Sequence, residues 1–126
     1  MLNKRILIVD DHEAILEIIE EALIYENYEV CVIRFGSQFF VAVADFKPDL
    51  ILLDYVLADN NGGDLCKELK ANPEFAHIPV IISSAYFIKG SHEPPPGCDG
   101  ILYKPFNLED LLDMVKYQVN RLTTEA

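Results

Sequence analysis

Residues 5–14 read RILIVDDHEA, and this stretch joins an apolar strand to a helix through two adjacent carboxylates. Four apolar residues, 6–9, run directly into Asp10 and Asp11. Adjacent like charges repel each other, and each loses hydration near a protein interior. The pair therefore indicates either an exposed edge, where water screens the charges, or a site where a positive group lies between them.

The same alternation of apolar run and helical pattern continues along the whole chain. Short apolar runs of strand length lie at residues 4–10, 28–34, 49–54, 78–85 and 100–103. Apolar residues at three- and four-residue spacing, typical of amphipathic helices, follow most of these runs. Strands that are apolar on both faces and alternate with helices predict a parallel sheet covered on both sides. We therefore expect a doubly wound α/β fold.

The helical patterns also predict which side chains face the core and where helices begin. We expect Ser37 to cap the second helix, a polar loop at 58–63 to lead into the third, and Asn107 to cap the last. The side chains expected to face inward are Ile15, Ile18, Ile19, Ala22 and Leu23; Phe40, Val43 and Ala44; Leu65, Cys66 and Leu69; and Leu108, Leu111, Leu112, Val115, Val119 and Leu122.

The composition predicts one acidic domain. The 126 residues suit a single domain spanning 1–126. The formal net charge of -11 argues against nucleic acid or an anionic membrane as a partner, because phosphate binding needs clustered Lys and Arg. No apolar run approaches the roughly 20 residues of a membrane span. The three cysteines, Cys31, Cys66 and Cys98, are widely spaced and predict reduced thiols in a cytoplasmic protein.

One segment, 86–100, departs from the alternating pattern. A fourth crossover helix is expected there, but three consecutive prolines cannot lie inside a helix, and Gly90 and Gly97 weaken it further. We expect this helix to be shortened or disrupted, and the segment to be the most mobile part of the protein. It is either a plain loop or a remodelled surface for a partner protein.

Polar side chains gather where the predicted strands end. In an open parallel sheet, ligands bind at the carboxyl ends of the strands. The residues at those ends are Asp10 and Asp11, Asp54, Ser83 and Ser84, and Lys104. Singly, each has an ordinary explanation, such as a helix cap at Asp11 or a solvated lysine at Lys104. Together they suit Mg²⁺, which prefers oxygen ligands, and a carboxylate nucleophile at Asp54 that attacks phosphorus, with Ser84 and Lys104 holding phosphoryl oxygens.

These motifs resemble the receiver domain of two-component response regulators. The resemblance covers nearly the whole chain and is carried by ILIVDD, PDLILLD, IPVIISSA and the Lys-Pro-Phe at 104–106. It implies a flavodoxin-like fold, with a five-stranded parallel sheet in the order 2-1-3-4-5. It also implies a Mg²⁺ site formed by Asp10, Asp11, the phosphoacceptor Asp54 and the backbone carbonyl of Val56.

The resemblance further implies roles for residues at the ends of the last two strands. Ser84, which precedes an alanine, is the switch hydroxyl, and Lys104 is the phosphate-binding lysine with a cis bond to Pro105. The family usually carries an aromatic switch residue three positions before the lysine, and here that position is Ile101. Ile101 has no ring to swing inward, so that form of switching is not carried over, although Tyr103 lies two residues later on the same sheet face.

Two flanking positions suggest a long-lived acyl phosphate. Val56 lies two residues past Asp54, and Tyr86 lies two residues past Ser84. Both side chains should flank the path of water to the phosphoryl group, and neither activates water well. We therefore expect slow hydrolysis for this family.

The expected function is a phosphoacceptor switch. Its phosphodonor would be a histidine kinase or a histidine phosphotransfer protein, and its output an unidentified downstream protein. It would not be an enzyme beyond catalysing its own phosphorylation and dephosphorylation. The alternatives are a degenerate receiver that acts only as an interaction module, and a true enzyme on a similar fold. A nucleotide-binding enzyme would need a glycine-rich turn where this chain has VDDHEA. A stand-alone regulator and a receiver from a larger protein fit the sequence equally.

Overall fold

The protein folds around one parallel sheet in the order β2-β1-β3-β4-β5. The computed structural model describes residues 3–85, 95 and 97–125, the last four of these by their backbone only. The strands are β1 Arg5–Val9, β2 Glu29–Ile33, β3 Leu50–Asp54, β4 Val80–Ser84 and β5 Gly100–Tyr103. All neighbouring strands pair in parallel, so the doubly wound fold and its strand order are confirmed.

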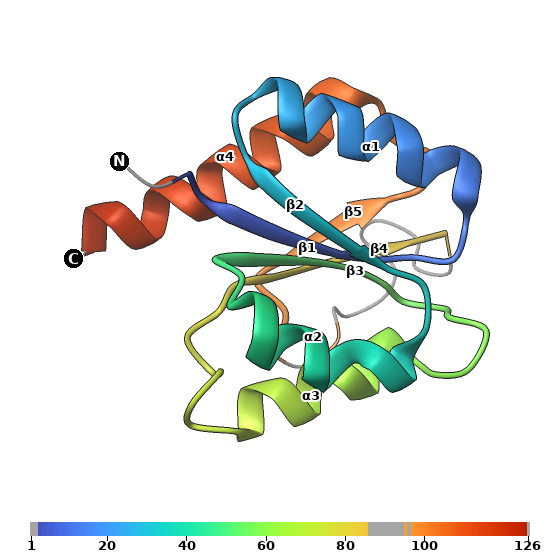
Figure 1. Cartoon of the computed structure of the whole chain (residues 1–126), viewed down its shortest axis with the longest axis vertical. Coiled ribbons are helices and arrows are strands. Elements are labelled where there is room, and N and C mark those ends of the chain that lie inside the picture. Colours follow the sequence, from blue (N-terminus) through green and yellow to red (C-terminus); the bar gives the residue numbers. More distant parts are fainter. Residues whose placement is uncertain (1–2, 86–94, 96, 126) are drawn as a thin grey trace.

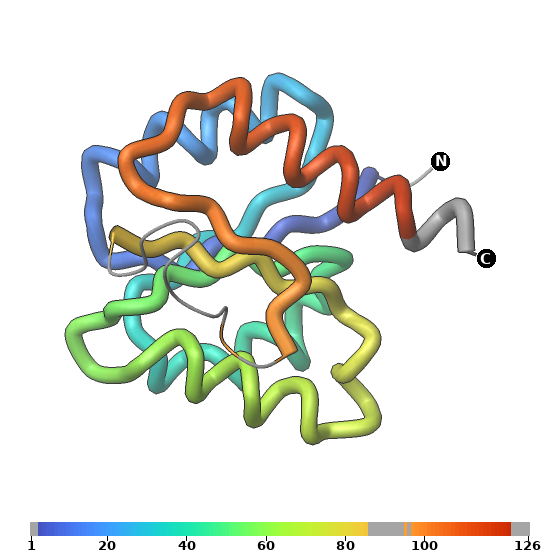
Figure 2. The backbone as a smooth tube through the Cα atoms, turned by 180° about the vertical axis from the view of Figure 1, so that it is seen from behind, coloured from blue at the N-terminus to red at the C-terminus, as the bar shows by residue number. Residues whose placement is uncertain are grey.

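Helices cover both faces of this sheet (Figure 1). Helices α1 Glu13–Tyr25 and α4 Leu108–Glu125 lie on one face, and α2 Phe39–Phe46 and α3 Gly62–Ala71 lie on the other. Figure 2 shows from behind that α4 runs beside α1, and these two helices contact each other. Within the described residues, no helix has the length and apolar character needed to cross a membrane.

The central strands are apolar on both faces because each face is packed under helices. Leu7 and Val9 of β1 belong to the core beneath α2 and α3, whereas Ile6 and Ile8 belong to the core beneath α1 and α4. Successive strand side chains point to opposite faces, so one continuous apolar run supplies both cores. Because both faces of the central strands are buried, their sequences are unbroken apolar runs.

The inward faces of the helices were predicted only in part. Ile18 is 54% exposed, and Ala44 and Leu108 are exposed as well, whereas Leu16 and Phe39 are buried instead. In α1 the buried residues follow Leu16 at three- and seven-residue spacing, which places Ile18 on the flank of the helix. The predictions are confirmed for Ile19, Leu23, Val43, Leu65, Cys66, Leu69, Leu111, Val115 and Val119. The side chain of Leu122 lies outside the described residues.

The start of α2 differs from the predicted Ser37 cap. Residues Gly36–Gln38 form a 3₁₀ turn, and Phe39 begins the helix. Asp59, from the loop after β3, accepts hydrogen bonds from the amides of Gly36 at 2.7 Å and Ser37 at 3.0 Å. A distant carboxylate therefore satisfies free amides of the 3₁₀ turn, and Gln38, whose side chain makes no capping hydrogen bond, precedes the helix in place of a Ser37 cap. The cap at the other predicted position is confirmed, because Asn107 accepts from the Asp110 amide at 2.8 Å.

A charged network ties α3 and α4 to the amino ends of β4 and β5. Lys70 donates to the Ile78 carbonyl at 2.7 Å and to Asp99 Oδ2 at 2.9 Å. The same carboxylate oxygen accepts from the Val80 amide at 2.8 Å, and Arg121 donates to Oδ1 at 3.3 Å. This Lys70 network lies at the edge of the sheet opposite the predicted site, so it anchors the scaffold without entering the site.

Predictions for the 86–100 segment fall mainly outside the described residues. The shortened helix, its mobility and the side chain of Tyr86 concern residues 86–94 and 96. Cys31, Cys66 and Cys98 form no disulfide among the described residues, and the reduced state of these thiols stays a prediction.

Candidate functional site

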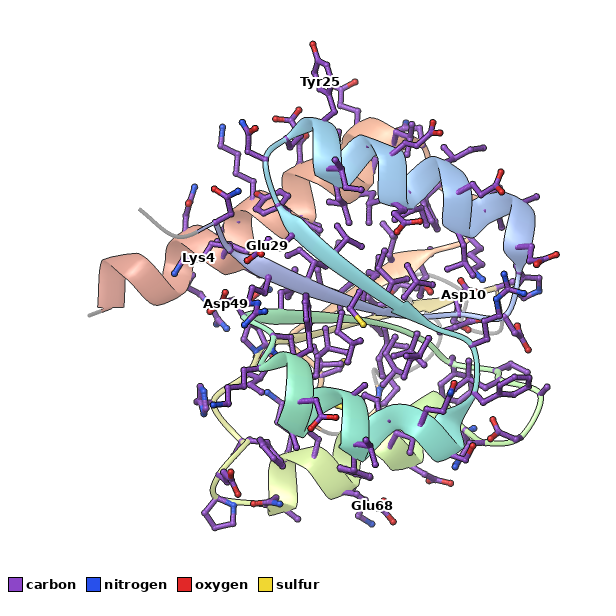
Figure 3. All side chains as sticks on the ribbon, in the orientation of Figure 1. Lys4, Asp10, Tyr25, Glu29, Asp49 and Glu68 are labelled. Atoms are coloured by element: carbon purple, nitrogen blue, oxygen red, sulfur yellow. The ribbon has the colours of Figure 1, made fainter. Side chains whose placement is uncertain are left out.

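The carboxyl ends of the strands bring the predicted polar residues to one edge. Asp10 follows β1 directly, Asp54 ends β3, Ser84 ends β4, and Lys104 follows β5. Figure 3 shows Asp10 where β1 leads into α1, at the opposite edge from Lys4. Parallel strands all end at the same edge, so residues from four parts of the sequence meet there.

A lysine lies between two buried carboxylates at this edge. Lys104 Nζ is 3.3 Å from Asp54 Oδ1 and 3.8 Å from Asp10 Oδ2. Asp10 is 4% exposed and Asp54 is 3% exposed, so water screens neither charge well. Lys104 therefore offsets part of the negative charge of Asp10 and Asp54.

His12 is a further residue of this site that was not predicted from the sequence. Its Nδ1 lies 2.9 Å from Asp10 Oδ1, 3.4 Å from Asp11 Oδ1 and 3.6 Å from Asp54 Oδ2. One potential ligand atom from each of these four residues lies within 4.8 Å of the others. His12 directly follows the acidic pair and precedes α1, and that position is the signal in the sequence that could have found it.

The surroundings of Asp54 disfavour its charged form. Burial, and secondly the charge of Asp10, raise the pKa of Asp54, while Lys104 and His12 oppose that rise. The hydrogen bond to Asp10 raises the pKa of His12. Asp54 Oδ2 is buried and finds no hydrogen-bond partner among the residues that the structure describes. A divalent cation fits this donor set, because it would satisfy that oxygen and offset the charge of three carboxylates.

The second acidic residue does not cap α1. His12 occupies the N-cap position, and Asp11 Oδ2 accepts a hydrogen bond from the amide of Ala58 at 3.0 Å. This bond joins the loop after β1 to the loop after β3. The second carboxylate of the pair therefore fixes the loop beside Asp54.

The loop after β3 folds back tightly against Asp54. Val56 forms an isolated bridge with Asn61, and the amide of Gly62 donates to the Tyr55 carbonyl at 2.7 Å. A Cβ atom at Gly62 would lie 2.2 Å from the carbonyl oxygen of Asp54, so only glycine fits here. The Val56 side chain is 59% exposed. The predicted role of its backbone carbonyl stays a prediction.

Two buried serines end β4 near the lysine. Ser84 is 2% exposed, and its carbonyl accepts from the Lys104 amide at 3.0 Å. Ser83 is 4% exposed and pairs in register with Asp54. The preference for Ser84 as the switch hydroxyl therefore stays a prediction. The cis bond between Lys104 and Pro105 is confirmed.

The predicted switch position lies on the last strand. Ile101 is half-buried and pairs with Ile82, whereas Tyr103 pairs with Ser84. Within β5, the aromatic residue in register with Ser84 is therefore Tyr103, one residue before Lys104. The role of Ile101 in switching stays a prediction.

Comparisons with known proteins agree with this geometry. The family model described as "Response regulator receiver domain" matches residues 6–116. The chain is 32% identical over 125 residues to the DNA-binding response regulator MtrA of Mycolicibacterium smegmatis, covering 95% of this chain but only 52%, about half, of MtrA. It is 30% identical over 117 residues to the polar-differentiation response regulator DivK of Brucella ovis, covering 91% of this chain and 95% of DivK.

A solved structure extends the likeness to the fold. The receiver domain of the sensor histidine kinase PA1611 from Pseudomonas aeruginosa, described with a magnesium ion coordinated in its active-site cleft, has a TM-score of 0.83 and 25% identity. That match covers 94% of this chain and 98% of the other. The chain belongs to the response regulator receiver domain family.

Proposed function

We propose that this chain is a signalling switch that accepts a phosphoryl group on Asp54 in a Mg²⁺-dependent reaction. The observation that carries the proposal is the buried Oδ2 of Asp54, which finds no hydrogen-bond partner among the described residues. Oδ1 of the same carboxylate is held by Lys104 at 3.3 Å, so the Asp54 carboxylate lies between a positive group and an unsatisfied position that suits a cation. The family membership and the acidic cluster support this assignment.

The metal would be held by Asp10, Asp11, Asp54 and the backbone carbonyl of Val56. Bound Mg²⁺ supplies positive charge that offsets the carboxylates and the phosphoryl oxygens. The Mg²⁺ described for the PA1611 receiver supports the choice of ion. The orphaned oxygen of Asp54 and the charge deficit supply the independent reason that this chain suits a cation.

In the transfer step, one carboxylate oxygen of Asp54 attacks phosphorus and forms a new O–P bond, while the other would be the metal ligand. The P–N bond of a phosphohistidine donor breaks, and the imidazole nitrogen keeps the electron pair and takes up a proton. Lys104 Nζ, beside the acceptor, binds a phosphoryl oxygen, and the Ser84 hydroxyl binds another. The donor is a histidine kinase or a histidine phosphotransfer protein, and the chain catalyses only its own phosphorylation and dephosphorylation.

Phosphorylation would change the surface around the site. The product adds about two negative charges beside Lys104, which biases the arrangement of the end of β4. The changed surface then binds a downstream protein. Because Ile101 replaces the usual aromatic residue, the switch rests on Ser84 and the backbone around it. With Val56 beside the phosphoryl group, slow hydrolysis is expected, and a half-life of seconds would contradict this part of the proposal.

Intact mass after incubation with acetyl phosphate tests the proposal. We expect a gain of one phosphoryl group with Mg²⁺ that is absent with EDTA and absent in Asp54→Asn. Asp45→Asn, an exposed aspartate on α2, is the matched control and should behave as the wild type. No gain from acetyl phosphate, and none from phosphorylated histidine phosphotransfer proteins, would contradict the proposal and favour the phosphorylation-independent interaction module.

A further inference from the structure

The position of His12 bears on which metal ions the acidic pocket can take. Its Nδ1 contacts one oxygen from each of three carboxylates, at 2.9 Å for Asp10, 3.4 Å for Asp11 and 3.6 Å for Asp54. The backbone amide of His12 also donates to Asp10 Oδ1 at 2.9 Å, so the residue is tied to the pocket at two points. A nitrogen therefore faces the same space as the carboxylate oxygens.

These distances match the spacing between ligands that share one metal ion. Metal–nitrogen and metal–oxygen bonds of about 2.0–2.2 Å place adjacent ligand atoms about 3.0–3.5 Å apart around an ion. The three distances from His12 Nδ1, 2.9, 3.4 and 3.6 Å, lie within that range or about 0.1 Å outside it. The His12 side chain is 57% exposed, so a small adjustment of the imidazole would not disturb the core.

A second observation points to a ligand in this space. Asp54 Oδ2 belongs to a residue that is 3% exposed, and it accepts no hydrogen bond from the described residues. This oxygen lies 3.6 Å from His12 Nδ1. A buried acceptor and an imidazole nitrogen at this separation fit one ion placed between them.

We propose that His12 Nδ1 joins Asp10, Asp11 and Asp54 in binding a divalent transition-metal ion of the Co²⁺, Ni²⁺ or Zn²⁺ class, in competition with Mg²⁺. Imidazole is a good ligand for these ions, whereas Mg²⁺ prefers oxygen. A pocket with oxygen ligands alone would add little selectivity for these transition-metal ions over Mg²⁺. The inference rests on the proposed function in that it uses the same carboxylates, but it does not depend on phosphoryl transfer.

Calorimetric titration with Co²⁺ and with Mg²⁺, at one fixed pH and without phosphodonor, tests the role of His12. We expect His12→Asn to weaken Co²⁺ binding about tenfold or more while changing Mg²⁺ binding by less than about twofold, because only the transition ion loses a preferred ligand. His77→Asn removes an exposed imidazole far from the acidic residues in sequence and serves as the matched control. It should leave both affinities unchanged.

Proton NMR of the Co²⁺-loaded protein identifies the ligand directly. An imidazole bound through Nδ1 keeps a proton on Nε2, and we expect a strongly shifted, exchangeable N–H resonance that disappears in D₂O. The signal should be present in the wild type and His77→Asn and missing in His12→Asn. Circular dichroism checks that His12→Asn is folded, and His12→Gln is a second variant that should show the same losses.

Equal Co²⁺ affinity in the wild type and both His12 variants, without the shifted resonance, would overturn the inference. The Mg²⁺-dependent mass gain on Asp54, measured on the same preparations, separates this failure from failure of the proposed function. A phosphoryl gain with no role of His12 in Co²⁺ binding defeats only the metal inference. A His12-dependent Co²⁺ site with no phosphoryl gain from any donor defeats only the proposed switch.

Discussion

Replacing Asp54 by asparagine should stabilise the metal-free protein. The Asp54 carboxylate is buried, its Oδ2 lacks a hydrogen-bond partner within the described residues, and the Asp10 charge lies nearby. Burial of a charged group costs free energy unless the group is fully paired. The neutral amide removes that charge while keeping the shape of the side chain.

The size of the effect follows from the contacts of the two Asp54 oxygens. Asparagine removes the buried charge and its repulsion by Asp10, a gain of about 1–3 kcal/mol, although its Nδ2 remains a buried polar group at the Oδ2 position. The opposing loss is small, because an amide oxygen can still accept from Lys104, which also keeps Asp10 at 3.8 Å. We expect the free energy of unfolding to rise by about 1 kcal/mol, which raises the Tm of a domain of this size by about 3–5 °C.

The stabilisation should depend on pH in a defined direction. Folding raises the pKa of Asp54, so the folded wild type binds its proton more readily than the unfolded chain does. The wild type therefore loses stability as the pH rises through the raised folded-state pKa, and the asparagine variant does not. The difference in the free energy of unfolding between the two proteins should be largest at neutral pH. It should disappear below the ordinary aspartate pKa, where Asp54 is protonated in both the folded and the unfolded wild type.

Magnesium should reverse the order of stability. A ligand that binds only the folded wild type stabilises it by about 2.7 kcal/mol when its concentration is one hundred times Kd. Asp54→Asn lacks a carboxylate ligand and should gain less. The wild type should then melt at the higher temperature.

Urea and thermal unfolding, monitored by circular dichroism, measure these differences. The samples are wild type, Asp54→Asn and the exposed control Asp45→Asn, in EDTA at neutral and acidic pH and again with saturating Mg²⁺. A lower stability of Asp54→Asn than of the wild type in EDTA at neutral pH would refute a net cost of the buried Asp54 charge. A difference between the two proteins that does not shrink in acid would refute it as well.

Three further predictions follow from the loop beside the site, the charged network and a buried thiol. Gly62→Ala should destabilise the protein by about 2 kcal/mol and slow phosphorylation, because its Cβ would lie 2.2 Å from the Asp54 carbonyl oxygen. Urea unfolding should show a smaller loss of stability for the control Gly100→Ala, whose Cβ would lie 3.3 Å from the flexible side chain of Met114. Lys70→Met should cost about 2–3 kcal/mol in urea unfolding, because two carbonyls lose their lysine donor and Asp99 keeps only Arg121 as a charged partner. The exposed Lys67→Met should stay within about 0.5 kcal/mol of the wild type. Burial raises the pKa of Cys66 to about 11, so iodoacetamide at neutral pH should leave this thiol unmodified in the folded protein, and labelling as fast as in urea would contradict its burial.

The sequence by itself determined the strands and most of the site. Apolar runs located all five strands, since burial on both faces leaves a signal that needs no knowledge of the partner strands. The meeting of Asp10, Asp54 and Lys104 was predictable for a related reason, because each directly follows or ends a parallel strand and such strands end at one edge.

Contacts between distant segments were decided only by the tertiary structure. The Asp59 carboxylate that caps the turn at Gly36, and the bond from the Ala58 amide to Asp11, join loops far apart in sequence and leave no local pattern. The approach of His12 to three carboxylates depends on how α1 leaves β1, because the direction of a side chain at a helix start follows from packing. Local periodicity specifies which face of an element is apolar, whereas the distances between polar groups exist only once the elements are packed together.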